Sequence, residues 1–327
     1  MADVRTRGPD TGDRVVDRAQ LILVAGLTIA VILVALVLLL NTVIYTENLA
    51  TRGVDAGGND AIEYRATVVV GVGELIDQEN WQFEEIDETK DSLRAGIGSI
   101  DDGLSDQYLR RGVLVEINRS NIEFEEGILV VQDEHRAFES PSNESDWDLA
   151  TDVKNIRQFS INTDRNSLNE TTAENATDDA FTISVDGGTW QLSIYENESG
   201  YLSVATTNGS GTTEVCSIDQ PEATLDVTGA TLDSNPCPAL IWADGVDSDE
   251  YTIEFLNGDE AQGTYDLTVD DGADLPVIED ILEIAIGEDD QPYSVDAVYS
   301  ASVDIRYEST DLRFGTTVRI ALGEPDA

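Results

Sequence analysis

The two cysteines are the clearest pair of residues with potential chemistry. Cys216 and Cys237 lie 21 positions apart, and Pro236 and Pro238 flank the second of them. An even pair of cysteines in an oxidising compartment favours a disulfide, and two isolated buried thiols are the alternative. No Cys-x-x-Cys motif is present, and neither residue has a Lys, Arg or His close in sequence to stabilise a thiolate. We therefore predict a structural disulfide between Cys216 and Cys237.

Histidine gives little support for catalysis or zinc binding. His135 is the only histidine, and no Gly-x-Ser-x-Gly motif accompanies it. A zinc site needs several His or Cys ligands at suitable spacing, which one His and two distant Cys residues cannot supply. No glycine-rich phosphate motif opens a helix after a strand pattern either. We expect His135 to be an exposed loop residue.

Carboxylates are abundant, and two clusters have the ligand type that Ca²⁺ or Mg²⁺ prefers. Neither cluster matches the twelve-residue calcium loop with its central glycine and terminal glutamate, so solvated surface is the expected role. A carboxylate pair for glycoside hydrolysis stays open, because such a pair is defined by spatial separation. The sequence thus predicts no catalytic residue, no metal site and no cofactor, and we expect that the protein is not an enzyme. The two clusters are Asp244, Asp247 and Asp249, and Asp270, Asp271 and Asp274.

Six Asn-x-Ser/Thr sequons are candidate sites of N-glycosylation. They are more numerous than the Asn, Ser and Thr content gives by chance, and all follow the apolar segment described below. We expect some of them to be modified. The sequons begin at Asn118, Asn143, Asn169, Asn175, Asn197 and Asn208.

The composition of the chain indicates a high-salt environment and excludes nucleic acid as a partner. The 327 residues include 66 Asp and Glu against 18 Lys and Arg, a net charge of −48, and only Lys90 and Lys154 are lysines. Nucleic acid is excluded as a partner, because phosphate binding needs clustered cations. A carboxylate-rich surface almost without lysine is similar to that of halophilic proteins, whose self-repulsion is screened by salt. An acidic mesophilic surface protein is the alternative. We predict salt-dependent folding.

One apolar segment is long enough to cross a bilayer. Leu21 to Leu40 carries no charge, and its 20 residues span about 30 Å as a helix. The segment is longer than the apolar core of a cleaved signal peptide. Because cations mark the cytoplasmic side, we predict a single-pass membrane protein with a cytoplasmic N-terminus and an extracellular C-terminal domain. The cations are Arg5, Arg7, Arg14 and Arg18 before the segment and Arg52 after it.

The residues that follow have first helical and then strand periodicity. A helix is expected from Asn59 or Asp60 to about Glu79, and a second is expected from an apolar stripe between Ile86 and Tyr108. Gly96, Gly98 and Gly103 weaken the second expectation, because each costs a helix about 1 kcal/mol relative to Ala.

From Gly112 onward the apolar residues alternate with period two. Asp186-Gly187-Gly188 joins two such runs as a hairpin turn, and Asn257-Gly258 lies between two more. Further runs lie at 113–117, 157–163, 297–307 and 312–322, and one helix is expected over Pro276 to Ile286.

These elements predict an α+β architecture in four segments. It consists of an N-terminal transmembrane helix and a helical stalk, followed by a mainly antiparallel β-sandwich-like head. The segments are a cytoplasmic segment at 1–20, a transmembrane helix at 21–45, a helical stalk at 46–111 and a β-rich external domain at 112–327.

At Asp17-Arg18-Ala19-Gln20, directly before the apolar run, the chain resembles haloarchaeal type IV pilin-like and related uncharacterised single-pass membrane-anchored surface proteins. The likeness continues through Asn41 to Asn48. The resemblance implies cleavage by a prepilin peptidase, here between Ala19 and Gln20. Many type IV pilins carry a glutamate at the fifth mature position, where this chain has Val24. Because of this departure, the resemblance does not by itself predict assembly into filaments.

Taken together, these features predict a membrane-anchored, pilin-like structural or interaction protein of the cell surface of a halophilic archaeon. Its expected partners are the lipid bilayer and other envelope or pilin-like subunits. The alternative is an anchored ectoenzyme or a solute- or metal-binding module with an unidentified carboxylate site. A deep pocket with convergent carboxylates would favour that alternative.

Overall fold

A computed structural model of the chain describes residues 58–325, apart from 210, 239, 244–245, 247 and 276–290, and describes only the backbone of 212–214. The chain divides into two compact units, Met1–Ile62 and Glu63–Ala327. Almost all described residues belong to the second unit. The expected cytoplasmic segment, the expected membrane span, the Ala19–Gln20 processing site and the helix expected over Pro276 to Ile286 lie outside the described residues.

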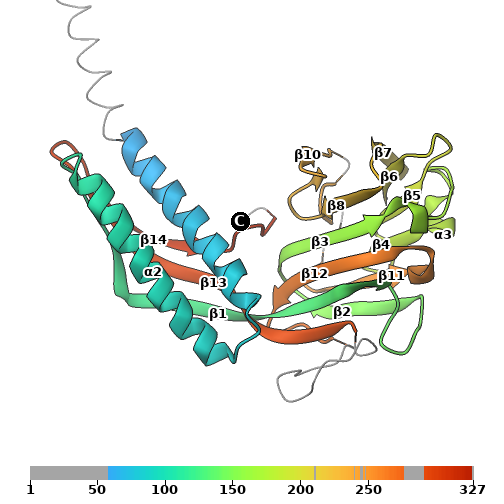
Figure 1. The fold of residues 1–327 in the computed structure, drawn as a ribbon, viewed down its shortest axis with the longest axis horizontal. Helices are drawn as coiled ribbons and strands as arrows, with labels where there is room; N and C mark the ends of the chain where they lie inside the picture. The colour runs from blue at the N-terminus through green and yellow to red at the C-terminus, as the bar shows by residue number, and fades with distance from the viewer. Residues whose placement is uncertain are drawn as a thin grey trace, which may run out of the picture. The chain divides into compact units, whose positions relative to one another are not determined.

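The second unit is mostly antiparallel β structure in two sheets (Figure 1). The larger sheet has eight strands in the order β10-β9-β8-β3-β12-β1-β13-β14, and the smaller has six in the order β2-β11-β4-β5-β6-β7. The strands are β1 (Leu114–Ala137), β2 (Trp147–Val153), β3 (Ile156–Asp164), β4 (Phe181–Val185), β5 (Trp190–Glu196), β6 (Leu202–Asn208), β7 (Gly211–Ile218), β8 (Glu222–Asp226), β9 (Thr231–Leu232), β10 (Asn235–Pro236), β11 (Tyr251–Leu256), β12 (Gln262–Asp270), β13 (Tyr293–Glu308) and β14 (Arg313–Ile320).

Two long helices precede the strands, and both pack on the larger sheet. The first is helical over residues 58–80, and the second is α2 (Ile86–Leu109). The first helix buries one side completely, because its apolar residues recur every four positions. The Tyr64 ring lies 5.5 Å from that of Tyr108 and 6.4 Å from that of Tyr307, so both helices meet β13 in one aromatic cluster. The fully buried stripe is Tyr64, Val68, Val72 and Ile76.

The expected architecture of a helical stalk and a separate β head is therefore wrong. α2 contacts β1 and β13 along its length, and the apolar stripe that predicted the helix faces the sheet. The stripe needed a partner surface to bury it, and the sheet supplies that surface. The short helix α3 (Ala176–Asp179) and the 3₁₀ turns η1 (Arg165–Ser167) and η2 (Gly258–Glu260) complete the helical segments that have been described.

The predicted localisation as a single-pass membrane protein is also contradicted. In the described ranges, no helix combines the length and the apolar composition needed to cross a bilayer. The two long helices carry many charged residues, such as Glu74 and Asp77 in the first and Asp101 and Asp102 in α2.

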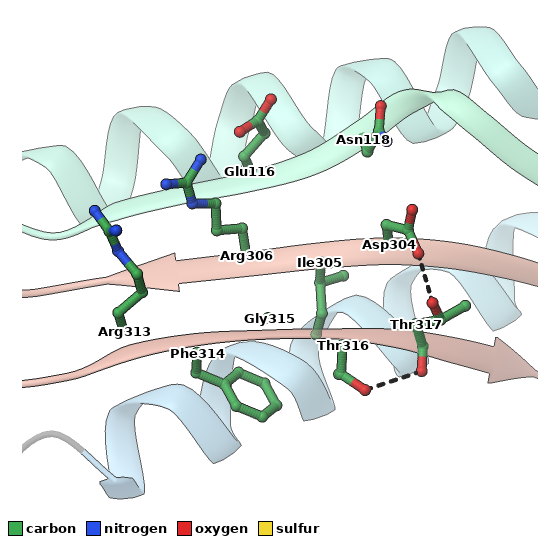
Figure 2. Close-up of a pocket in the computed structure, with 10 residues that line it drawn as sticks. All are labelled: Glu116, Asn118, Asp304, Ile305, Arg306, Arg313, Phe314, Gly315, Thr316 and Thr317. Atoms are coloured by element: carbon green, nitrogen blue, oxygen red, sulfur yellow. Dashed lines mark hydrogen bonds between the residues drawn. The ribbon is translucent and has the colours of Figure 1, made fainter.

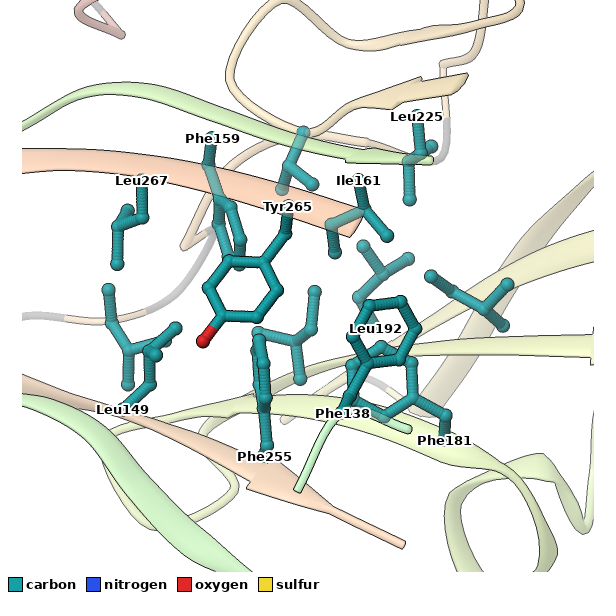
Figure 3. Packing of buried hydrophobic residues seen from close by; sticks show 14 of the residues in the cluster. Phe138, Leu149, Phe159, Ile161, Phe181, Leu192, Leu225, Phe255, Tyr265 and Leu267 are labelled. Atoms are coloured by element: carbon teal, nitrogen blue, oxygen red, sulfur yellow. The ribbon is translucent and has the colours of Figure 1, made fainter. Parts of the chain in front are cut away.

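The main core lies between the two sheets (Figure 3). Phe138, Phe181, Phe255 and Tyr265 pack their rings at centroid distances between 4.5 and 6.1 Å. The long strand β1 connects this core with the helices. Its second half lies between β12 and β13, and its first half pairs with the end of β13 beneath the helices. The β1–β13–β14 part of the sheet thus has one face covered by helices.

Candidate functional site

The open face of β1, β13 and β14 carries a groove of about 610 Å³ (Figure 2). Alternation along β13 explains its chemistry: Val303, Ile305 and Tyr307 are buried, while Arg306 between them is exposed. In Figure 2 the Glu116, Arg306 and Arg313 side chains point to one side of the strands. The groove is lined by Glu116, Asn118, Asp304, Ile305, Arg306, Arg313, Phe314, Gly315, Thr316 and Thr317.

Ion pairs organise one end of this groove. Glu308 accepts a hydrogen bond from Arg313, and its other oxygen lies 3.2 Å from the Arg306 guanidinium. The hydrogen bond from Arg313, together with the charges of both arginines, lowers the pKa of Glu308 below its ordinary value. The carboxylate therefore remains ionised at neutral pH.

Neutral donors organise the other end. The Thr317 hydroxyl donates to Asp304 at 2.6 Å, and the Asn121 amide donates to the second oxygen of Asp304 at 2.9 Å. These hydrogen bonds, led by that of Thr317, lower the pKa of Asp304. A general acid or base needs a pKa close to the working pH. Asp304 and Glu308 have the opposite character, which suits recognition through fixed charges.

A second groove, of about 640 Å³, is lined by residues of β1, β13 and β14, by the end of β12 and the residues that follow it, and by Lys154 and Asn155 before β3. Arg319 donates to Glu125 at 2.9 Å, bonds Glu324 and lies 5.7 Å from the centre of the Tyr299 ring. The hydroxyl of Ser300 is the largest cause of the lowered pKa of Glu125. Arg319 is thus already paired with carboxylates on this groove and beside it.

Two members of the predicted carboxylate clusters, Asp270 and Asp274, have structural roles, and Asp271 is exposed. Asp270 accepts the backbone N–H groups of Lys154 and Asn155 at 2.9 and 2.8 Å. The backbone of Asp274 forms a β-bridge with that of Thr151. Asp249 is exposed, and its companions Asp244 and Asp247 lie outside the described residues. Among the residues that have been described, no three His, Cys, Asp or Glu side chains are grouped to hold a metal ion.

The remaining site predictions have separate positions. Cys216 and Cys237 form a disulfide, which confirms the predicted pairing. His135 is exposed near the end of β1 and lies in none of the grooves described above.

The six sequons differ in the environment of their asparagines. Asn143 and Asn175 are exposed, and Asn169 is exposed but donates its amide to the Asp179 carbonyl at 2.7 Å. Asn197 donates to Ser203 at 2.9 Å. Asn118 and Asn208 are half-buried on strands.

We expect glycan occupancy to be higher at Asn143 and Asn175 than at Asn197. The transferase must reach the amide nitrogen, and in Asn197 that nitrogen is a hydrogen-bond donor while the side-chain oxygen accepts from Ser199 N and Tyr201 N. Mass spectrometry of intact glycopeptides from the native protein measures the occupancy. Higher occupancy at Asn197 than at Asn143 would contradict this expectation.

Asp266 is a carboxyl group that the sequence patterns do not single out. It lies half-buried on β12, on the opposite face from Tyr265 and Leu267, and accepts a hydrogen bond from Gln158 at 2.8 Å. Burial, and to a smaller extent the charges of Asp77 and Asp226, raise its pKa to about 7, and the hydrogen bond from Gln158 opposes this shift.

Replacing Asp266 by Asn is expected to stabilise the protein at alkaline pH. A raised folded-state pKa means that the native state binds the proton more tightly, so stability is lost as pH rises from about 4 to about 7. At pH 8 the Asp266→Asn variant should exceed the wild type by roughly 2–4 kcal/mol, and near pH 4 the two should agree. Urea unfolding at both pH values measures this difference. Exposed Asp178→Asn is the control for removal of one negative charge, and a pH-independent gain equal to that of the control would refute the prediction.

Comparison with known proteins adds one partial similarity. The model of a family of unknown function, DUF7261, matches residues 15–145, which is less than half of the chain. The matched range includes the first helix, α2 and β1, and it excludes β13 and β14. No curated protein and no solved structure matches the chain.

Proposed function

We propose that this protein is a non-catalytic structural or interaction protein that presents its acidic β-domain to other proteins in concentrated salt. The observation that carries the proposal is the charge-paired groove on the open face of β1, β13 and β14. Asp304, which lines the groove, and Glu308, which pairs with the lining residues Arg306 and Arg313, have lowered pKa values and fixed donors. Such a surface can recognise a partner by charge and shape, whereas proton transfer needs groups that titrate near neutral pH.

The resemblance to pilin-like proteins of haloarchaea supports the same class of role, since pilin subunits act through contacts with other proteins. The net charge of −48 supports a halophilic setting. Membrane anchoring is no part of the proposal.

We expect the melting temperature of the full chain to fall as KCl is lowered from about 1 M to about 0.01 M, because the Debye length grows from about 3 Å to about 30 Å. Repulsion among the carboxylates then acts across the whole surface. Thermal denaturation followed by circular dichroism measures the change. Sucrose without KCl is the control, since it does not screen charge. A melting temperature that is constant across the salt series would contradict the halophilic assignment.

Photo-crosslinking in the native cell tests the interaction role. Glu123 pairs with Ser302 across β1 and β13 and is exposed on the open face, so a photoreactive amino acid there should crosslink to other proteins. Asp186, exposed in the β4–β5 turn, is the control position. Equal crosslinking at both positions would refute the assignment of this face.

Titration with Ca²⁺ and Mg²⁺ at constant ionic strength tests the alternative function, a metal-binding module. A saturable rise in melting temperature would identify such a module.

A further inference from the structure

Strand β14 is the outer strand of the larger sheet. It pairs with β13 from Ala301↔Ile320 to Glu308↔Arg313, and no other described strand pairs with it. An unpaired edge presents backbone donors and acceptors that can template an added strand. Most proteins block such edges, so the residues along this one are informative.

The hairpin that leads into β14 determines which of its backbone groups face outward. Ser309 N–H donates to the Leu312 carbonyl at 2.8 Å, so these two residues form a hydrogen-bonded pair. Hydrogen-bonded and non-hydrogen-bonded pairs alternate along an antiparallel ladder. The next pair, Glu308 with Arg313, is therefore non-hydrogen-bonded. The same alternation turns the N–H and C=O groups of Arg313, Gly315, Thr317 and Arg319 away from β13.

The charge of β14 differs from that of every other described strand. It contains Arg313 and Arg319 and no Asp or Glu, whereas each of the other thirteen described strands has a net charge of zero or below. In a chain with a net charge of −48, this is an exception. Arginines on an edge repel a second copy of the same edge, and they also favour an acidic strand.

The open groove meets this edge at Gly315. On β13, Arg306 is the direct partner of Gly315. Arg313 lies on β14, two residues before Gly315. A Cβ atom built on Gly315 would meet only the Ile305 carbonyl oxygen, at 3.5 Å. A carboxylate from an added strand can occupy the space over Gly315 and accept from the guanidinium donors of Arg306 and Arg313 that Glu308 does not use.

We propose that β14 binds an extended acidic segment of a partner protein as a ninth strand of the larger sheet. This inference rests on the interaction role proposed above and names its partner. The outward backbone groups of β14 supply the ladder, and Arg306 and Arg313 select the acidic sequence. High salt permits this binding. At about 1 M the Debye length is about 3 Å, so the long-range repulsion between the acidic protein and the acidic segment is screened, while direct contacts between arginine and carboxylate persist.

The test uses two labelled peptides and the full-length protein in 1 M KCl. One blocked nonapeptide alternates glutamate with valine or threonine, and its twin has lysine at each glutamate position. The variant Thr317→Pro removes one outward N–H and no bond of the β13 ladder. Thr317→Ala keeps that N–H and loses only the hydroxyl bond to Asp304. Circular dichroism confirms that both variants fold.

Fluorescence anisotropy should show that the glutamate peptide binds the wild type and Thr317→Ala alike, and binds Thr317→Pro at least about tenfold more weakly. The lysine peptide should bind the wild type at least about tenfold more weakly than its twin. Equal binding to Thr317→Pro, preference for lysine, or no binding of the glutamate peptide overturns the proposal.

Two further measurements separate the competing outcomes. Crosslinks from Glu123 that persist in Thr317→Pro would leave the interaction role intact and refute the role of the β14 edge. Sedimentation velocity tests whether a second copy of this chain, in place of a separate partner, pairs with the β14 edge. A wild type that self-associates while Thr317→Pro remains monomeric would identify a second copy of this chain as the occupant and refute the assignment to a separate partner.

Discussion

Replacing Arg157 by alanine is expected to lower the free energy of unfolding by about 3–5 kcal/mol, because it leaves a carboxylate without its partner in a partly buried position. The Arg157 side chain has no exposed surface. Its guanidinium forms an ion pair with Asp77 of the first helix and donates to the carbonyls of Gly73 at 3.4 Å and Val298 at 3.3 Å. It therefore connects β3, the first helix and β13.

The pKa values of this pair indicate how closely its charges depend on each other. Burial is the largest influence on both: it lowers the pKa of Arg157 and raises that of Asp77, and the attraction between the two groups opposes both shifts. Removing Arg157 leaves Asp77 with the burial penalty and the charge of Glu74, both of which raise its pKa. The loss of packing around the arginine side chain adds to that cost.

Denaturant unfolding in 2 M KCl, followed by tryptophan fluorescence, measures the effect. Arg165→Ala is the matched control, because Arg165 pairs with Asp219 at 3.1 Å in an exposed position and should cost less than about 1 kcal/mol. A double variant with Arg157→Met and Asp77→Leu should regain most of the loss, since an apolar pair of similar volume carries no desolvation cost. A single variant no less stable than the control would refute the assigned role of the pair.

Replacing both Cys216 and Cys237 by serine should lower the free energy of unfolding by about 2–5 kcal/mol. Cys216 lies on β7, an edge strand of the smaller sheet. Cys237 directly follows β10, the edge strand of the larger sheet opposite β14. The disulfide thus joins the edges of the two sheets, across 21 residues of chain. Loop-closure estimates for a loop of this length give about 3 kcal/mol.

Urea unfolding of the double variant measures this contribution, and reduction of the wild type under native conditions provides an independent comparison. Peptide mapping without reduction should find the link between residues 216 and 237 in the protein as isolated. Ser217→Ala on the same strand is the control for a local side-chain change, because Ser217 only exchanges a hydrogen bond with Ser203. An unchanged urea midpoint after loss of the disulfide would refute a stabilising role.

Local periodicity predicted several elements correctly. The helix expected up to Glu79 and the stripe from Ile86 to Tyr108 correspond to the helix at 58–80 and to α2. The hairpin at Asp186-Gly187-Gly188 is confirmed, with positive φ at all three residues, and β4 pairs with β5 across it. Such features depend on neighbours within a few residues, so the sequence itself contains the information.

The glycines of α2 show where local reasoning is incomplete. Gly96 weakened the helix prediction, yet its missing side chain is what the packing requires. A Cβ atom at Gly96 would lie 2.6 Å from the Leu75 side chain of the first helix. The close approach of two helices repays a propensity cost of about 1 kcal/mol, and only the tertiary structure reveals the partner.

The two alternating runs predicted on either side of Asn257-Gly258, at 251–255 and 265–269, show the same limit for strands. Each forms a strand as predicted, but β11 pairs with β2 and β4 in the smaller sheet, while β12 pairs with β1 and β3 in the larger. The Asn257-Gly258 segment between them, with φ of 54° at Asn257, carries the chain from one sheet to the other. A period of two identifies a strand and its buried face, but it does not identify the neighbouring strand.

By itself, the sequence determined the charge, the disulfide pair and the types of the local elements, because these depend on composition and near neighbours. The candidate site depended on the tertiary structure. By its position in the alternating pattern, Arg157 should lie on the same face of β3 as Phe159 and Ile161. The β3–β12 pairing has a register shift at which Arg157 has no partner on β12, and its side chain pairs with Asp77 instead. The groove likewise unites β1 with β13 and β14, nearly two hundred residues later in the chain. Long-range strand pairing brought these residues together, and no local period encodes which distant strands will pair.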